Sequence, residues 1–411
     1  MSDARVTRIT DRMADDGSRV HTRDMRNVRK IAAAAALALV CAASTAQPQS
    51  LPNRLSDDDF WRLVSDLSEA GGYFRSDNFV SNETTFQHVI PELVRSHPSG
   101  GVYLGVGPDQ NFTYIVALKP RLSIVTDIRR QNMIEHLMYK AVIELSPTRA
   151  DFLTLLFSRP RPAGLADTTG AAGLLQAYVA APADSVAYRK NLAAIKEQLT
   201  GRHRFTLSAD DLSSLAYVYE AFFEGGPELT YSFSVGRQGR AGYFGRRMPT
   251  YAELMAEADA LGTRRSYLAS EENYRVLRDL ETNNLIVPIV GDFAGEKAIR
   301  AVGAYLKQHN ATVTAFYTSN VEQYLFQQAD DWKHFFANVA TLPLDARSTF
   351  IRAVFNYMGF RDPVSGVPGP RSTTMLSPIL DLLKAVDDGK VQTYYDIIQL
   401  STAPVPGPSQ R

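Results

Sequence analysis

The segment Val102-Tyr-Leu-Gly-Val-Gly107 decides the fold that this sequence predicts. Three residues that favour strands run into two glycines, and an apolar segment that suits a helix, Tyr114–Leu118, follows. Glycines after a strand let the chain turn tightly and let a ligand approach the backbone and a helix N-terminus. A strand-to-helix turn also needs glycine for steric reasons alone, so the pattern fits a ligand loop and a plain turn equally.

The flanking segments alternate between strand and helix patterns. The predicted strands after the first are Leu122–Thr126, Ile286–Val290 and Thr312–Tyr317. The predicted helices between and after them are Met133–Val142, Glu296–Gln308 and Val321–Phe326. Alternation of this kind predicts an α/β fold, Rossmann-like, with a mostly parallel sheet in which the four strands lie side by side.

Other segments predict what surrounds this sheet. Ser56, with Asp59 three residues on, predicts the start of a helix, and Tyr73–Glu83 predicts an ordered loop. Ser146-Pro147 predicts an N-cap and a first-turn proline for a helix that runs through Phe157. The residues from about 171 to 280 are mainly of helical pattern, which predicts a helical insertion in the α/β domain.

The chain divides into five predicted parts. Residues 1–24 are a polar extension that precedes a possible start at Met25, residues 25–46 are a signal peptide, and residues 47–54 are a linker. Residues 55–400 are the Rossmann-like domain with its insertion, and residues 401–411 are a disordered Pro-rich tail.

The signal peptide is predicted from a basic start, an apolar run and small residues at a cleavage site. Arg26 to Lys30 carries the positive charge, Ile31 to Ala43 is apolar, and Ser44-Thr-Ala46 supplies the site. We expect export to the periplasm or the medium, with no stable membrane anchor after cleavage. An Ala-rich helix on a cytosolic protein is the alternative. A lipoprotein is disfavoured because Leu39 and Val40 precede Cys41, where small residues are needed.

Composition narrows the partners. Lys plus Arg and Asp plus Glu both number 44, so no basic footprint for nucleic acid is expected. Cys41 is the sole cysteine, and the seven histidines are scattered, so no metal site is predicted. The expected partner is a small-molecule ligand, and nothing in the sequence indicates a protein partner.

Asp127 stands at the end of the second strand, 22 positions after Gly105 (127 − 105). A carboxylate at this distance from a glycine turn can accept hydrogen bonds from both ribose hydroxyls of an adenosine. The alternative is an N-cap for the helix that follows.

These features together resemble the class I S-adenosylmethionine (SAM) methyltransferases. Val102–Gly107 matches that family's cofactor loop, and Ile124-Val-Thr-Asp127 matches its ribose acid. Ile289-Val-Gly-Asp292 matches its motif after strand four, with Thr312–Tyr317 as the next strand. The resemblance implies that SAM is the cofactor and that the residues around it are Gly105, Gly107, Asp109 and Asp127.

The sequence departs from the family at three points. Tyr103 replaces the usual acidic residue, Asp109 replaces the third glycine, and a long insertion separates Asp127 from Asp292. A second resemblance, to SAM-using aminocarboxypropyl transferases, rests on the helices that follow Asp127. An NAD-dependent dehydrogenase would need glycine where Gln110 stands.

Two groups of residues are candidates for the chemistry of such a site. We expect Asp292, Tyr317 and Asn320 to meet at the carboxyl edge of the sheet, where they can orient a nucleophile or accept its proton. Tyr317 as a core residue and Asn320 as a helix cap are the alternatives. The loop before the first strand would contact substrate through Arg75, Asn78, Asn82 and Glu83, although ordinary loop polarity explains these residues equally well.

The sequence therefore predicts a SAM-dependent transferase-like protein, most simply a methyltransferase, of unknown substrate. The alternative is an exported, non-catalytic Rossmann-like module that has lost SAM. Export favours this alternative because SAM is a cytosolic metabolite.

Overall fold

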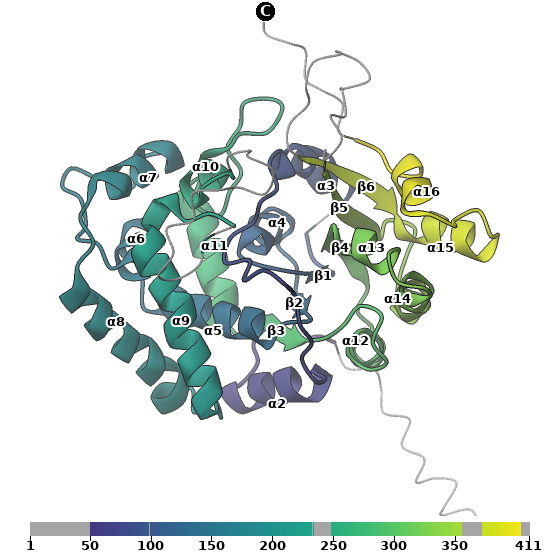
Figure 1. Cartoon of the computed structure of the whole chain (residues 1–411), viewed down its shortest axis with the longest axis horizontal. Coiled ribbons are helices and arrows are strands. Elements are labelled where there is room, and N and C mark those ends of the chain that lie inside the picture. Colours follow the sequence, from purple (N-terminus) through teal and green to yellow (C-terminus); the bar gives the residue numbers. More distant parts are fainter. Residues whose placement is uncertain (1–49, 98, 232, 234–247, 356–371, 404–411) are drawn as a thin grey trace, which may run out of the picture. The chain divides into compact units, whose positions relative to one another are not determined.

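The computed structural model describes residues 50–97, 99–231, 233, 248–355 and 372–403. Within these ranges six strands form one sheet in the order β3-β2-β1-β4-β5-β6 (Figure 1). The strands are β1 (Val102–Gly105), β2 (Leu122–Asp127), β3 (Ile286–Val290), β4 (Val313–Ser319), β5 (Thr349–Phe355) and β6 (Ser372–Pro378). β1 to β5 pair in parallel and β6 pairs antiparallel to β5. The prediction of four neighbouring parallel strands is confirmed.

The α-helices fall into those outside the helical insertion and those within it. The observed insertion runs from Arg149 to Ala256, so it begins and ends before the predicted bounds of about 171 and 280. The first group is α2 (Asp57–Leu67), α3 (Ile90–Ser96), α4 (Gln110–Leu118), α5 (Arg130–Glu144), α11 (Glu271–Thr282), α12 (Ala298–Gln308), α13 (Val321–Leu325), α14 (Asp331–Val339), α15 (Ile379–Asp387) and α16 (Tyr394–Gln399). The second group is α6 (Arg149–Phe157), α7 (Ala171–Ala180), α8 (Ser185–Glu197), α9 (Ala209–Gly225) and α10 (Tyr251–Ala256). Short turns of other helix types are η1 (Phe86–Val89), η2 (Gln198–Arg202) and η3 (Gly226–Glu228).

The strand order follows from right-handed crossover connections. From β1 through β3 the chain moves toward one edge of the sheet, and α4, α5 and α11 pack together on the side of those crossovers. From β3 the chain returns past β1 to β4 and β5, so α12 and α14 pack together on the opposite side. The direction of travel reverses between β1 and β4, and ligands of open α/β sheets bind at such a point beyond the carboxyl ends of the strands.

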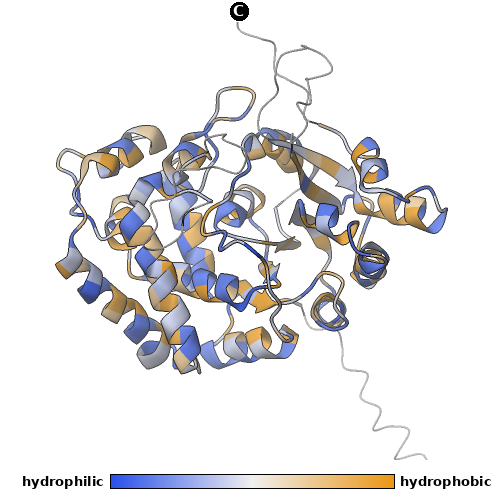
Figure 2. Ribbon diagram, in the orientation of Figure 1, coloured by the Kyte–Doolittle hydropathy of each residue, from blue (hydrophilic) through white to orange (hydrophobic). Residues whose placement is uncertain are grey.

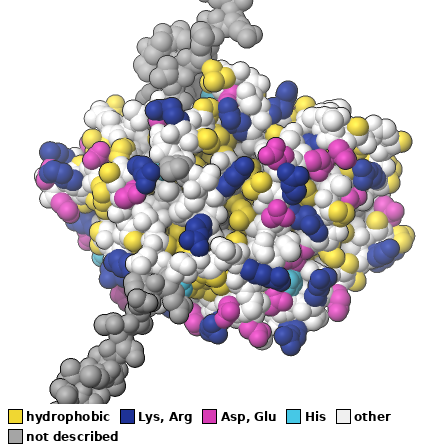
Figure 3. Space-filling model, turned by 180° about the vertical axis from the view of Figure 1, so that it is seen from behind, with side chains coloured by type: hydrophobic (Ala, Val, Ile, Leu, Met, Phe, Trp, Pro, Cys, Tyr) yellow, Lys and Arg dark blue, Asp and Glu magenta, His cyan; other side chains and the backbone are white. Residues whose placement is uncertain are grey.

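The central strands are buried on both faces. Every residue of β1, β2 and β3 is buried, which explains their nearly continuous apolar sequences. In Figure 2 these strands are mainly orange, whereas the surrounding helices carry both orange and blue residues. On the face that Figure 3 shows, basic and acidic side chains are interspersed over the described surface.

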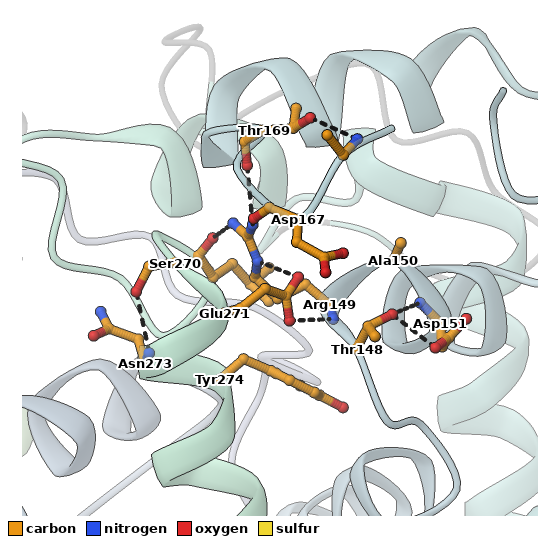
Figure 4. A network of polar contacts seen from close by, with 12 residues as sticks. Thr148, Arg149, Ala150, Asp151, Asp167, Thr169, Ser270, Glu271, Asn273 and Tyr274 are labelled. Atoms are coloured by element: carbon orange, nitrogen blue, oxygen red, sulfur yellow. Dashed lines mark hydrogen bonds and ion pairs between the residues drawn. The ribbon is translucent and has the colours of Figure 1, made fainter. Parts of the chain in front are cut away.

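The helical insertion packs on α5 and is held by a buried arginine. α9 contacts α5, α6 and α8, so the insertion continues the core instead of forming a separate body. Arg149 donates to Oε1 of Glu271 at 2.8 Å and to the carbonyl oxygens of Asp167 and Thr169 at 2.7 and 3.0 Å (Figure 4). The insertion is thereby joined to α11, which leads back into β3.

Three boundaries differ from the sequence-based expectation. Leu51, which lies inside the predicted linker 47–54, and Leu55 are buried in the core, because apolar side chains gain more from burial than from exposure, whereas Asn53 and Arg54 between them are exposed. Thr148 is the N-cap of α6 instead of Ser146, since its side chain accepts the amide of Asp151. Thr402, which falls within the predicted tail 401–411, exchanges two backbone hydrogen bonds with Leu376 of β6.

The predicted extension, signal peptide and Cys41 lie outside the described residues, as does the tail from residue 404. Within the ranges that the structure describes, no helix has the length and apolar character that crossing a membrane requires.

Candidate functional site

A cavity of about 830 Å³ lies at the carboxyl ends of β1 to β4. Its walls come from the loop 73–83, from the segments that follow each of these strands, and from α13 and Tyr231, Phe233 and Met248. This volume lies in the range of about 300–1,000 Å³ that is usual for small-molecule sites.

The cavity brings together nine of the eleven residues that the sequence predicts for the site. These nine are Arg75, Asn78, Asn82, Glu83, Gly107, Asp127, Asp292, Tyr317 and Asn320. Gly105 and Asp109 do not line it. The predicted meeting of the 73–83 loop with the strand ends is therefore observed, although several residues have other surroundings than expected.

Gly105 is required by a neighbouring side chain and not by a ligand. A Cβ atom at Gly105 would stand 1.9 Å from Oδ1 of Asn111. Asn111 is buried, accepts from the Tyr103 hydroxyl at 2.9 Å and donates to the carbonyl oxygens of Val106, Gly107 and Pro108 at 2.9, 3.2 and 2.7 Å. The glycine thus makes room for the amide that holds the loop in shape.

Gly107 lines the cavity and has the open surroundings that a ligand-facing glycine requires. Its φ of +76° is the left-handed conformation that favours glycine, and no atom lies within 4 Å of an added Cβ. Its carbonyl oxygen accepts from Nε2 of the buried His136 at 2.8 Å. Burial lowers the pKa of His136 to about 4, so the imidazole is neutral near pH 7 and serves to hold the loop.

Asp109 does not bind cofactor in this arrangement. It is buried away from the cavity at the start of α4 and accepts from the Tyr267 hydroxyl at 2.8 Å. Burial raises the pKa of Asp109 to about 7. Asp109, which stands where the family has its third glycine, is therefore a buried acid and makes no contact with the cavity.

Asp127 is paired with Arg129, which the sequence analysis did not select. Oδ1 and Oδ2 of Asp127 accept from Nε and Nη2 of Arg129 at 3.0 and 2.9 Å, and Oδ1 also accepts the Arg129 amide at 2.9 Å. Asp127 is not the N-cap of α5, because Arg129 occupies that position. The carboxylate faces the cavity, as predicted, but a guanidinium now holds both of its oxygens.

Glu83 is the most buried carboxyl group of the cavity wall, with 1% of the residue exposed. Oε1 accepts from the hydroxyls of Tyr317, at 2.8 Å, and Ser319, and Oε2 accepts from Nε2 of Gln110 at 2.8 Å. Burial raises the pKa of Glu83, and the three donors act in the opposite direction. No cation takes part in these three bonds, so a positively charged ligand would gain from the position.

Tyr317 donates its hydroxyl proton to Glu83 and is not suited to accept one. Burial raises the pKa of Tyr317 well above 10, and the nearby Glu83 raises it further. The phenol therefore stays protonated near neutral pH. The observed bond gives Tyr317 the role of orienting the Glu83 carboxylate, and it does not favour the predicted role of proton acceptor in this state.

Asp292 and Asn320 line the cavity from different strands. Asp292 follows β3, which lies beside β2, whereas the strand beside β1 is β4. The position after strand four that the resemblance implies thus falls to Ser319 and Asn320, and its assignment to Asp292 is corrected. Oδ1 of Asp292 accepts from the amide of Ala294 at 2.9 Å, and burial raises its pKa. Asn320 is the N-cap of α13 without a side-chain cap bond.

The described lining is acidic and rich in aromatic rings. The charged residues are the acids Asp77, Glu83, Asp127, Asp292 and Asp331 and the bases Arg75 and Arg129. The rings are Tyr73, Phe74, Tyr231, Phe233, Phe293, Tyr317 and Tyr324. Acidic groups and ring faces both attract organic cations. Within the described ranges no group of three or more His, Cys, Asp or Glu side chains is placed to hold a metal ion.

Sequence reasoning missed residues whose roles depend on a distant partner. Arg129 had one local signal, since a base two residues after an acid at a strand end can fold back onto it. Gln110 and Asn111 had none, because amides at the start of a helix are common.

Comparison with known proteins gives one family match. The family described as "Domain of unknown function (DUF7790)" matches residues 78–367, which is more than half of the chain and includes most of the cavity wall. No curated protein matches the chain.

Proposed function

The chain belongs to the DUF7790 family, and we propose that this protein is a SAM-dependent transferase, most simply a methyltransferase. The observation that carries the proposal is the acidic, aromatic cavity at the point where the strand order reverses. SAM combines an adenosine with a sulfonium and an amine, and it would supply an activated methyl group when bound.

The wall suits the parts of such a ligand. The five acids and two arginines of the described lining favour a net cation, and they disfavour a dinucleotide with its two phosphates. Gly107 leaves open space beside the loop at the end of β1. Phe74 and Tyr324, whose ring centroids are 5.3 Å apart, offer flat apolar surfaces for a base or a sulfonium.

The proposed role of Asp127 comes from the resemblance, and those of the other protein groups from their contacts. Asp127 receives the ribose, and Glu83 presents a negative charge that Tyr317 and Ser319 orient. Asp292 and Asn320 position the acceptor substrate, since alignment is most of what methyl transfer requires. The acceptor itself stays unassigned, and export to the periplasm or the medium remains a prediction from the sequence.

Calorimetry with SAM and S-adenosylhomocysteine tests the proposal. Because S-adenosylhomocysteine lacks the sulfonium charge, the acidic cavity should bind SAM more tightly by about tenfold, which corresponds to about 1.4 kcal/mol. Absence of heat with both ligands at millimolar concentration would overturn the proposal.

A second candidate function is a non-catalytic ligand-binding or structural module. The Asp127–Arg129 pair favours it, because both oxygens that a ribose needs are held by the guanidinium. In this case neither adenosyl compound binds, while the cavity retains affinity for other organic cations such as tetramethylammonium.

A further inference from the structure

Glu135 is a buried carboxyl group without a hydrogen-bond partner in the described part of the chain. It lies on α5, and both Oε1 and Oε2 are unpaired. Nδ2 of Asn132 and the hydroxyl of Tyr139, three residues before and four after it, are buried and unpaired as well. Positions at this spacing share one face of a helix. Buried polar atoms are paired in most native structures, so this cluster calls for an explanation.

Charged groups from several elements act on Glu135. Asp127 of β2, Asp109 before α4 and Asp77 of the 73–83 loop are the anions, and Arg129 before α5 is the cation. Burial raises the pKa of Glu135 well above its usual value, and Arg129 opposes this shift. Burial therefore favours the protonated form of this carboxyl group while the guanidinium is bound to Asp127.

Arg129 is held by groups at the cavity wall. Besides the two bonds to Asp127, its Nη1 donates to the carbonyl oxygens of Asp77 and, at 3.3 Å, Ser76. A ribose cannot use both oxygens of Asp127 until the guanidinium leaves them. The guanidinium is itself almost fully buried, with 6% of its side chain exposed, so departure without a new anion would leave an unpaired buried charge.

We infer that Glu135 is the second partner of Arg129. When the hydroxyls of a ligand diol donate hydrogen bonds to Asp127, the guanidinium moves to the unpaired carboxyl group of Glu135. Helical side chains lean toward the N-terminus of their helix, which for α5 is the side of Arg129. The exchange replaces one buried ion pair by another, and Glu135 releases its proton to solvent when the pair forms. Glu135 is thus a positioning residue that acts through Arg129. The ligand in this inference rests on the proposed function, whereas the movement of Arg129 does not.

The first test needs no ligand. The variant Asp127→Ala removes both acceptor oxygens and the negative charge that hold the guanidinium, so a crystal structure should show Arg129 within hydrogen-bonding distance of Glu135. A structure of this variant in which the Arg129 side chain has not moved and Glu135 is still unpaired would overturn the inference.

The second test is a double-mutant cycle read by SAM affinity. Glu135→Gln should weaken SAM binding about tenfold, because Arg129 then lacks a charged partner after it leaves Asp127. The same substitution in an Arg129→Met background should have no further effect. A purely structural role predicts equal losses in both backgrounds, and this result, or no loss in either, contradicts the inference. Melting temperatures identify variants that fail to fold.

The two proposals fail in different ways. If the unaltered protein does not bind SAM, the proposed function is wrong, and the Asp127→Ala structure still decides whether Arg129 moves. If SAM binds and Glu135→Gln binds it equally well, the proposed function stands and the transfer to Glu135 is wrong.

Discussion

The Asn111 side chain leaves no room for a side chain at Gly105, since an added Cβ would lie 1.9 Å from Oδ1 of Asn111. Position 105 therefore requires glycine because of the Asn111 side-chain amide, which holds the loop. A side chain at position 105 is therefore expected to disturb the loop itself, whether or not a ligand is present.

Gly105→Ala should lower the free energy of unfolding by about 1–3 kcal/mol, because Asn111 must give up part of its network. Urea denaturation measures the loss. Gly107→Ala is the matched control, with open space around the added Cβ and only the conformational cost of about 1–2 kcal/mol for a left-handed residue. If Gly105→Ala left stability unchanged but abolished SAM binding, the glycine would instead be needed for ligand binding.

Asp109→Asn should make the protein more stable at alkaline pH. The pKa of Asp109 is about 7 in the folded protein and near 3.8 when unfolded, so stability is full below about pH 4 and falls as the pH rises toward 7. Asparagine removes this loss and can still accept from Tyr267. The variant and the parent should have equal stability at pH 4, and the variant should gain a few kcal/mol at pH 8.

The same variant tests the placement of Asp109. Because its carboxyl group lies outside the cavity, SAM affinity should not change. A loss of affinity without a loss of stability would show that Asp109 contacts ligand after all.

Arg149→Met should destabilise the protein by about 3 kcal/mol or more. The change removes the donor from Glu271 and from three carbonyl oxygens in a position where 2% of the arginine side chain is exposed. Arg161→Met is the control, since the Arg161–Asp151 pair is partly exposed and should contribute less than about 1 kcal/mol. Equal unfolding midpoints in urea for the two variants would contradict this assignment.

Glu83→Gln should weaken SAM binding by about tenfold and affect S-adenosylhomocysteine less, because it removes negative charge where a cation would lie. SAM affinity of the parent should rise with pH as Glu83 ionises, given its raised pKa. Glu257→Gln is a suitable control: burial raises the pKa of Glu257 to about 7, yet this residue is not part of the described cavity wall. Equal effects of Glu83→Gln and Glu257→Gln on SAM affinity would show that Glu83 does not contact the ligand.

Export is a prediction that protein chemistry can check directly. Cleavage after Ala46 would leave Gln47 as the mature N-terminus of protein recovered outside the cytoplasm. N-terminal sequencing of the material from each fraction decides it, and an uncleaved chain confined to the cytosol would contradict the prediction.

Local sequence was sufficient for the elements and for part of the site. The apolar runs of β1 to β4 and the Ser56 cap of α2 depend on neighbours along the chain, so their positions were predicted to within a few residues. Since parallel strands end at the same edge of a sheet, the convergence of Asp127 and Tyr317 followed from the pattern. The antiparallel strand β6 and the strand β5 beside it were not predicted.

The partners of each group were decided by tertiary structure alone. Strand order brought β4 beside β1, and burial turned Tyr317 into a donor to Glu83. Packing also set Asn111 against Gly105 and Arg129 against Asp127. The physical reason is that strand and helix patterns depend on residues a few positions apart, whereas pKa values, ion pairs and close contacts depend on groups that only the folded chain brings together.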